Sequence, residues 1–415
     1  MGITIVQKSN LETPKRNPKI ALVLSGGAVS GGAFKIGGLR ALDRFMVNRD
    51  VRDFDMFVGI SAGSVIAAYL ANNVSVEDIH TSMIDRKGPL SAVKPFEFYS
   101  LNKADILKTP LHIIGDLASI TSRKVFGFLC ANNIFRKQFR RQLYAFATNP
   151  SNAGLEKFSA YCFERKELAV NHPSLPWHYL PNGLFKTDRI EQATRRNFEK
   201  NALCNNFNEL FRKTGKELYI VAMKLDTAQR TIFGHDQDNT APVTRAMQAS
   251  IAFPLFFKPV TIDGADYIDG AVIKTTSMDF AIEKGADLVI CYNPFRPFNH
   301  ESFDENNPDG RKRISIARDG IAAVINQVMR TMLHTRLMHG IKHYRDNPEF
   351  KGDIILIEPT EHDDRFFDMN PFSINDRRKA SKRGFESVTN SLRKNEAILK
   401  KILAAYGIEA RPEMA

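Results

Sequence analysis

Short apolar runs alternate with helical patterns near the start of the chain. Two runs typical of buried strands, 20–24 and 56–58, are each followed by helical spacing, over 33–45 after the first and 65–71 after the second. Strands that alternate with helices are typical of βαβ units. The pattern therefore predicts an α/β fold.

The middle of the chain interrupts this alternation. The stretch 78–184 shows no clear strand pattern and carries many aromatic and basic residues, so it predicts a helical insertion after the second helix. Its densest parts, 123–129 and 135–141, interleave Phe with Arg and Lys. Such segments fit a lid that faces a lipid surface, or equally a helix with its Phe face on the core and Arg outward.

Strand-like order returns at 218–225 and 231–234, and a further strand is predicted at 353–359. The stretch 314–344, before the last of these strands, has helical spacing. The stretch 374–406, after it, is a basic helical region that packs on the domain or faces solvent. The apolar stripe of the first helical stretch favours core packing over a membrane anchor. Its members are Ile314, Ala317, Ile321, Val324, Val328 and Met332.

These patterns predict three parts of the chain. An N-terminal extension covers 1–18, and a main α/β domain with the helical insertion covers 19–300. The remainder, 301–415, is expected to be mostly helical with one sheet strand and to pack on the core.

Composition narrows the kind of protein. Of the 415 residues 43% are hydrophobic and 25% charged, as in ordinary globular proteins. The formal net charge of +12 favours an anionic partner, either a phospholipid surface or a nucleic acid. No nucleic-acid-binding module is recognisable, which favours an anionic membrane surface. A homo-oligomer is compatible with the sequence.

Neither a metal site nor a secretory route is predicted. The four cysteines, Cys130, Cys162, Cys204 and Cys291, lie far apart without a C-x-x-C pair, which argues against a disulfide framework or a zinc site. No apolar run reaches 18 residues and the first 19 residues do not resemble a signal peptide. We therefore expect a cytoplasmic protein that associates peripherally with membranes.

The pentapeptide Gly59-Ile60-Ser61-Ala62-Gly63 lies between the second strand pattern and its helix. A G-x-S-x-G motif in this context predicts a nucleophile elbow, in which Gly59 and Gly63 let the backbone turn sharply and expose the Ser61 hydroxyl. The alternative is a strand-to-helix turn with a serine that caps the helix. Ser61 is thus a candidate nucleophile.

A glycine-rich turn, 25–32, joins the first strand pattern to its helix. Backbone N–H groups at such a helix N-terminus attract an anion. The spacing does not give G-x-G-x-x-G, and Gly32 is followed by Ala33 and Phe34 instead of the Lys-Ser/Thr of a phosphate-binding loop. An oxyanion hole fits the turn best.

The tripeptide D-G-A occurs twice within nine residues, at Asp263 and at Asp269. Asp263-Gly264 has strand patterns on both sides and predicts a hairpin turn. Asp269-Gly270 follows the second of these strands, and strand ends are where ligand sites of open α/β sheets collect. Asp269 is therefore the candidate functional carboxylate, and Asp263 is assigned a structural role.

With these motifs the chain resembles the patatin-like phospholipase family. The marks are the glycine-rich turn at 26–31, the elbow at 59–63, the Ala-Ser-x-Ala-x-Pro run at 249–254 and the D-G-A at 269–271. The resemblance implies a three-layer α/β/α fold with a central, mostly parallel sheet. It also implies a catalytic dyad of Ser61 and Asp269 that hydrolyses fatty-acyl esters of phospholipids or other lipids, without cofactor or metal.

The implied mechanism uses an acyl-serine intermediate. Asp269 accepts the proton of Ser61, and the oxyanion is held by N–H groups around Gly26, Gly27 and Ala28. Gly59, Gly63 and Gly270 support the turns.

The turn departs from the family form G-G-G-x-R/K-G, because Ala28 replaces the third glycine, Ser30 replaces the basic residue and Gly32 adds one position. Since the donors are backbone N–H groups, an alanine is tolerable there unless a positive φ is required.

Two alternatives compete with this interpretation. An α/β-hydrolase-type esterase or triacylglycerol lipase would use a histidine, but only about two strands precede Ser61 instead of several. A catalytically silent lipid-binding protein would keep the fold without the reaction. Histidines do lie downstream of Ser61, but none has a setting that singles it out; among them are His300, His334, His339, His343 and His362.

Overall fold

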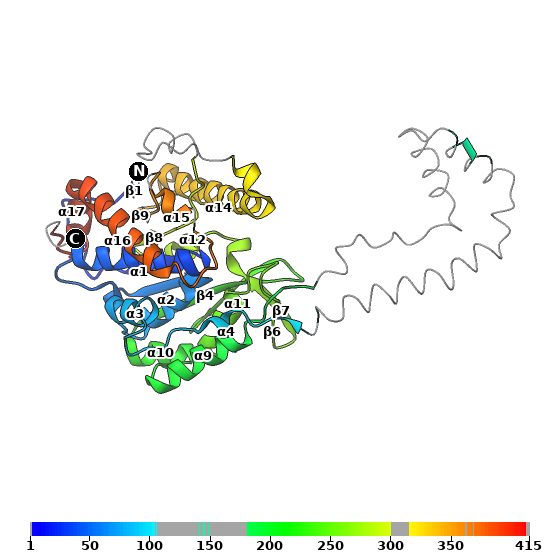
Figure 1. The fold of residues 1–415 in the computed structure, drawn as a ribbon. Coiled ribbons are helices and arrows are strands. Elements are labelled where there is room, and N and C mark those ends of the chain that lie inside the picture. Colours follow the sequence, from blue (N-terminus) through cyan, green and yellow to red (C-terminus); the bar gives the residue numbers. More distant parts are fainter. Residues whose placement is uncertain are drawn as a thin grey trace. The chain divides into compact units, whose positions relative to one another are not determined.

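The computed structural model describes residues 2–103, 181–299, 315–361, 363–367 and 369–411, together with positions 105, 141, 144, 145 and 148. The chain forms two compact units, Met1–Ser100 with Phe185–Ala415, and Leu101–Leu184. The predicted Phe- and Arg-rich segments 123–129 and 135–141 lie outside the described residues, except for Arg141. The first unit contains the sheet (Figure 1).

Nine strands of the described residues form one mixed sheet with the order β1-β9-β8-β2-β3-β4-β7-β6, and β5 pairs with β4 outside this path. The five strands β9, β8, β2, β3 and β4 run parallel, whereas β1, β5, β6 and β7 pair antiparallel. The bounds are β1 (Ile3–Gln7), β2 (Ile20–Leu24), β3 (Met56–Ile60), β4 (Glu217–Lys224), β5 (Gln229–Gly234), β6 (Val260–Ile262), β7 (Ala265–Asp269), β8 (Leu288–Tyr292) and β9 (Asp353–Ile357).

Helices and short 3-10 turns connect these strands. The α-helices of the described residues are α1 (Ala28–Phe45), α2 (Ala62–Ala71), α3 (Val76–Met83), α4 (Pro95–Phe98), α9 (Asp188–Lys200), α10 (Phe207–Thr214), α11 (Val243–Ser250), α12 (Met278–Glu283), α14 (Ile321–Asp346), α15 (Asp364–Phe367), α16 (Arg377–Lys394) and α17 (Glu396–Ala405). The 3-10 turns are η1 (Val51–Asp53), η4 (Gly270–Val272) and η5 (Ile316–Asp319).

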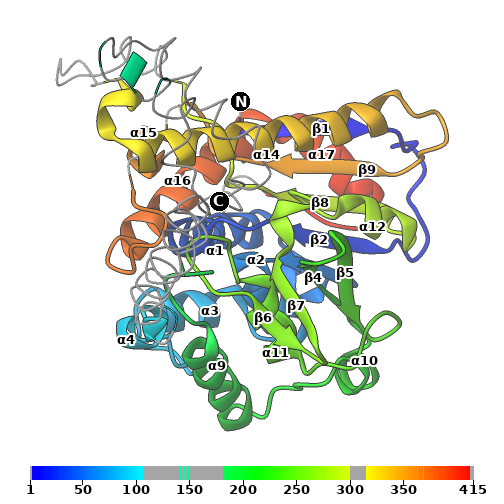
Figure 2. The ribbon, with the colours of Figure 1, turned by 90° about the vertical axis from the view of Figure 1, so that its right-hand side faces the viewer.

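Strand β2 shows how helices cover both faces of the sheet. Its alternate residues Ile20, Leu22 and Leu24 belong to a core with α1, α2 and α16, whereas Ala21 and Val23 belong to a second core with α12 and α14. Successive side chains of a strand point to opposite faces. The architecture is therefore α/β/α in three layers around a mostly parallel sheet, as the resemblance implied (Figures 1 and 2).

Helix α1 begins at Ala28, five residues before the predicted start at Ala33. Glycines 31 and 32, which favour a later start by their low helix propensity, lie inside the helix. A side chain at Gly31 would begin 3.1 Å from Pro294, and one at Gly32 would begin 3.3 Å from Ala62. Close packing therefore outweighs propensity, and the loop between β2 and α1 is only Ser25 to Gly27.

The basic region predicted at 374–406 forms α16 and α17 and packs on the core. Gly37 of α1 and Gly384 of α16 let the two helix backbones approach closely, because a Cβ on Gly37 would lie 1.8 Å from the Ser381 carbonyl oxygen, and one on Gly384 1.9 Å from that of Phe34. Of the two alternatives for this region, packing on the domain is the one observed.

The stripe predicted to pack in the core over 314–344 is largely exposed where it runs along α14. Ile321, Val328 and Met332 belong to the exposed hydrophobic residues. The buried positions are instead Leu333, Leu337 and Ile341. Helical spacing places apolar residues on one face, but it does not decide which of two apolar faces meets the sheet.

Both edges of the sheet carry antiparallel strands. The predicted N-terminal extension contains β1, which pairs with β9 from Ile3 opposite Ile357 to Gln7 opposite Asp353. At the other edge, β6 and β7 form the predicted hairpin, whose turn has positive φ at Asp263 (48°) and Gly264 (75°). The predicted hairpin turn at Asp263-Gly264 is confirmed.

Candidate active site

Ser61 lies in a strained turn between β3 and α2. Its φ of 54° and ψ of −130° are unusual for a residue with a side chain, and such a conformation costs about 1–3 kcal/mol. The Ser61 N–H donates to Ser250 Oγ at 2.8 Å, and Ser250 Oγ donates to the Val221 carbonyl at 2.7 Å. Buried Ser250 therefore ties the elbow to β4.

The two elbow glycines are needed for close approach rather than for their own φ. A Cβ on Gly59 would lie 2.4 Å from Ser64 Cα, and one on Gly63 would lie 2.3 Å from the Leu24 carbonyl oxygen. The positive φ of the elbow belongs to Ser61 itself. Any side chain at 59 or 63 would push α2 away from β2 and β3.

The register of β4 brings Asp269 next to Ser61. Residues Tyr219–Val221 pair with both β3 and β5, and Ala222–Lys224 pair with both β5 and β7, so β3 and β7 share one edge of β4. In the strand register Val221 pairs with Ile60 of β3, and the next residue, Ala222, pairs with Asp269 of β7. Two residues far apart in sequence thus meet where β3 ends and β7 ends.

The Asp269 carboxyl is almost fully buried, with 1% of the residue exposed. Burial raises its pKa to about 6, against the lowering effects of hydrogen bonding with the Ser61 side chain and the Ala271 N–H, and of the Lys35 charge. The Ala271 N–H donates to Asp269 Oδ1 at 2.9 Å. Gly270 packs closely against β4, since a Cβ there would lie 2.5 Å from the Val221 carbonyl oxygen.

The glycine-rich turn packs directly on Ser61. A Cβ on Gly26 would lie 3.1 Å from Ser61 Cβ and 3.2 Å from the Phe295 ring. Gly27 has a φ of 134° and Ala28 a φ of 51°, so the position of the missing third glycine does require a positive φ. Within the described part of the chain, the N–H groups of Gly26, Gly27 and Ala28 have no hydrogen-bond acceptor.

Lys35 is a site residue that the sequence analysis did not select. It is fully buried in α1, and its ammonium donates to the carbonyl oxygens of Ser25 and, at 2.5 Å, of Gly26. Burial lowers the pKa of Lys35 to about 7, although the negative charge of Asp269 raises it. One sequence signal was available, because Lys35 is the only charged residue between positions 20 and 39.

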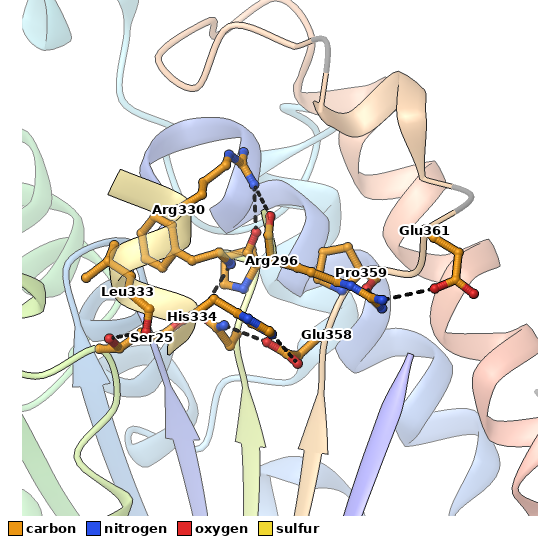
Figure 3. Close-up of polar contacts among 12 residues, drawn as sticks. Ser25, Arg296, Arg330, Leu333, His334, Glu358, Pro359 and Glu361 are labelled. Atoms are coloured by element: carbon orange, nitrogen blue, oxygen red, sulfur yellow. Dashed lines mark hydrogen bonds and ion pairs between the residues drawn. The ribbon is translucent and has the colours of Figure 1, made fainter. Parts of the chain in front are cut away.

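Arg330 and Glu358, from the C-terminal part of the chain, hold the segment 293–296, which covers the glycine-rich turn (Figure 3). Pro294 lies against Gly27, and its carbonyl oxygen accepts from Arg330 of α14 at 3.0 Å. Asn293 connects this segment to the turn at Ser25 and to Glu358, with distances of 3.2 and 2.8 Å. The strands β8 and β9 end at these residues, so this group of residues lies at the carboxyl end of the parallel sheet.

Three of the histidines named from the sequence lie on α14. His334 contacts Glu358 at 3.3 Å, in the group that holds the segment over the turn, and His339 and His343 are exposed. His300 and His362 lie outside the described residues. Over the described ranges, no cluster of three or more His, Cys, Asp or Glu residues could hold a metal ion, and no helix is both long and apolar enough to cross a bilayer.

Solved structures of two bacterial proteins resemble the chain weakly. VipD from Legionella pneumophila is 15% identical over 95% of this chain and 70% of its own, with a TM-score of 0.39. ExoU from the type III secretion system of Pseudomonas aeruginosa, in complex with SpcU, is 16% identical over 85% of this chain and 56% of its own, with a TM-score of 0.28.

Sequence comparisons are more specific. A "Probable lipid hydrolase 463L" of Invertebrate iridescent virus 6 is 27% identical over 103 residues, which are 24% of this chain and 36% of the viral protein. The chain thus matches only about a third of that relative. The model of the patatin-like phospholipase family matches residues 22–282, well over half of the chain, including the glycine-rich turn, Ser61 and Asp269. The chain therefore belongs to the patatin-like phospholipase family.

Proposed function

We propose that the protein is a lipid acyl hydrolase of the phospholipase A type, with Ser61 as nucleophile and Asp269 as base. One observation carries the proposal: the buried Asp269 carboxyl interacts with the Ser61 side chain at the point where β4 brings β3 and β7 together. Family membership supports a lipid ester as substrate.

The reaction would proceed in two steps. Asp269 takes the hydroxyl proton as Ser61 Oγ bonds to the ester carbonyl carbon. It gives this proton to the leaving-group oxygen when the tetrahedral intermediate collapses, so that the ester bond breaks and the alcohol leaves. Water then attacks the carbonyl carbon of acyl-Ser61 while Asp269 takes one of its protons, and Asp269 returns that proton to Ser61 Oγ as the bond between Ser61 and the fatty acid breaks. Each step develops negative charge on the carbonyl oxygen.

The N–H groups of Gly26, Gly27 and Ala28, which have no acceptor among the described residues, are the proposed donors to that oxygen. They lie at the N-terminus of α1, where the helix dipole also favours negative charge. Loss of one such donor typically reduces kcat by about 10²–10³-fold. The raised pKa of Asp269 makes this carboxylate a stronger base than an ordinary aspartate.

The direct test compares wild type with Ser61→Ala and Asp269→Asn on phospholipid, lysophospholipid and triacylglycerol vesicles, with EDTA present. Asp263→Asn is a matched control, because it changes the other D-G-A aspartate in an exposed hairpin turn. We expect both site variants to lose at least about 10³-fold in activity and the control to keep it. Equal activity in all variants would refute the dyad.

The two alternatives are separated by labelling and by histidine substitution. A fluorophosphonate probe is expected to label wild type at Ser61 and not Ser61→Ala, whereas an unlabelled, folded wild type would support a silent lipid-binding protein. His334→Ala, His339→Ala and His343→Ala are expected to remain active. A large loss in one of them would favour a histidine-dependent esterase. An anionic membrane surface as partner, a peripheral location and a homo-oligomer stay predictions.

A further inference from the structure

The outer face of α14 carries an unexplained apolar row. Ile321, Ile325, Val328 and Met332 are 75%, 44%, 50% and 53% exposed, and their spacing of four, three and four residues places them on one side of the helix. The opposite side of the helix packs in the protein through the buried residues Leu333, Leu337 and Ile341. The row is therefore a surface of a firmly held helix, and it lies outside the residues that match the family model.

The same face becomes basic in its second half. Arg336, His339, Lys342 and His343 are exposed, and no Asp or Glu occurs between Ile321 and Arg345. An apolar patch beside cations fits the boundary between acyl chains and anionic headgroups. The core of a protein interface is, in contrast, depleted in charged residues, lysine in particular. Charge complementarity thus favours a lipid surface over a second copy of the chain.

The row also lies on the helix that holds the segment over the glycine-rich turn. On the inner side of α14, Arg330 Nη1 donates to the carbonyl oxygens of Pro294 and Arg296 at 3.0 and 3.3 Å. The Leu333 carbonyl accepts from Thr275 Oγ1 at 2.8 Å, six residues after Asp269. Figure 3 shows Arg330, Leu333 and His334 above the ends of the parallel strands. A membrane on the outer side would therefore lie at the catalytic end of the sheet.

We propose that the outer face of α14 docks on an anionic phospholipid bilayer, with Ile321, Ile325, Val328 and Met332 in the interfacial layer and the basic second half over the headgroups. The helix axis would lie parallel to the bilayer surface, because the apolar row and the basic residues follow each other along one face of the helix. The proposal rests on the proposed function only for the choice of lipid as partner, because docking itself requires no hydrolysis.

The test measures vesicle binding and hydrolysis separately. Binding is followed by co-sedimentation of full-length protein in the Ser61→Ala background, with phosphatidylcholine vesicles that contain or lack phosphatidylglycerol. The docking variant is Val328→Asp/Met332→Asp, and Thr331→Asp is the control, since it adds an acid to an exposed position of the same helix outside the row. Hydrolysis of a water-soluble short-chain ester is measured in the same variants with Ser61 intact.

We expect the docking variant to bind anionic vesicles at least about tenfold more weakly than Ser61→Ala alone, and the control to bind within about twofold. Soluble-ester hydrolysis should be unchanged in both. If the docking variant binds anionic vesicles as strongly as Ser61→Ala alone, the proposal is overturned. This holds also if light scattering shows that the docking variant has a changed oligomeric mass. Equal binding to vesicles without phosphatidylglycerol overturns the anionic preference. Vesicle binding without any ester hydrolysis by wild type would refute the proposed function and leave this inference standing.

Discussion

The ammonium of Lys35 lies 2.5 Å from the carbonyl oxygen of Gly26, and it also donates to that of Ser25. Across a trans peptide the C=O and N–H bonds point in opposite directions. A cation that holds these two carbonyls therefore directs the N–H groups of Gly26 and Gly27 away from itself. Lys35 thus fixes the orientation of two proposed oxyanion donors without contact with the substrate.

Replacing this ammonium should impair catalysis more than substrate binding. In Lys35→Met the two carbonyls lose their donor, so the turn is no longer held and kcat is expected to fall about 10- to 100-fold with little change in KM. Steady-state kinetics on a soluble ester measure both constants. Lys200→Met, at an exposed helix end, is the control and should match wild type. An unchanged kcat in a folded Lys35→Met protein would show that the turn needs no cation.

The pH dependence of activity should be bell-shaped. Asp269 acts as a base only when ionised, so kcat/KM is expected to rise as pH increases through about 6, the pKa that burial gives this carboxyl. Lys35 holds the turn as an ammonium, so activity is expected to fall as pH increases through about 7. A pH profile of kcat/KM on a neutral soluble ester measures both limbs.

The same profile of Lys35→Met separates the two groups. Without the lysine charge, which lowers the pKa of Asp269, the ascending limb should move to higher pH, and the descending limb should disappear. If wild type and Lys35→Met had identical pH profiles, the descending limb would not belong to Lys35, and the lysine charge would not affect the pKa that sets the ascending limb.

Ser250 should matter for both stability and catalysis. Its Oγ accepts from the Ser61 N–H and donates to the Val221 carbonyl, so Ser250→Ala leaves two buried groups unpaired and should cost about 1–3 kcal/mol of unfolding free energy. The strained elbow loses its anchor, and kcat should also fall. Ser82→Ala removes a buried acceptor of the Leu90 N–H away from the site and should lower stability alone. Chemical denaturation with kinetics distinguishes the two effects.

Local sequence signals predicted the elements and the chemistry of single positions. Strand β2 was predictable because all five of its residues are apolar, and Ser61 and Asp269 were selected by short motifs at strand ends. The hairpin at Asp263 followed from its D-G pair. In each case the residues that form the pattern are neighbours in sequence. The roles of Ser61 and Asp269 as a dyad came from the family resemblance and stay a prediction.

What the sequence did not reveal depends on contacts between distant segments. The meeting of β3 and β7 on one edge of β4 is a matter of register, which no residue type specifies. Ser250 and Arg330 act through backbone groups of other elements, and any polar side chain could do so in the right place. For α14, periodicity identified an apolar face but not that a second face would be buried.

Ala28 combines a β-carbon with a φ of 51°, a conformation that costs a non-glycine residue about 1–2 kcal/mol. Ala28→Gly restores the glycine of the family turn and removes this strain, while the greater freedom of glycine in the unfolded chain offsets about 0.4–1 kcal/mol of the gain. A net stabilisation of about 0.5 kcal/mol is therefore expected in chemical denaturation, with kcat changed less than about twofold because the N–H remains. The control Ala193→Gly lies in the middle of helix α9 and should destabilise by about 1 kcal/mol. If Ala28→Gly destabilised the protein as much as this control, the positive φ at position 28 would not be a source of strain.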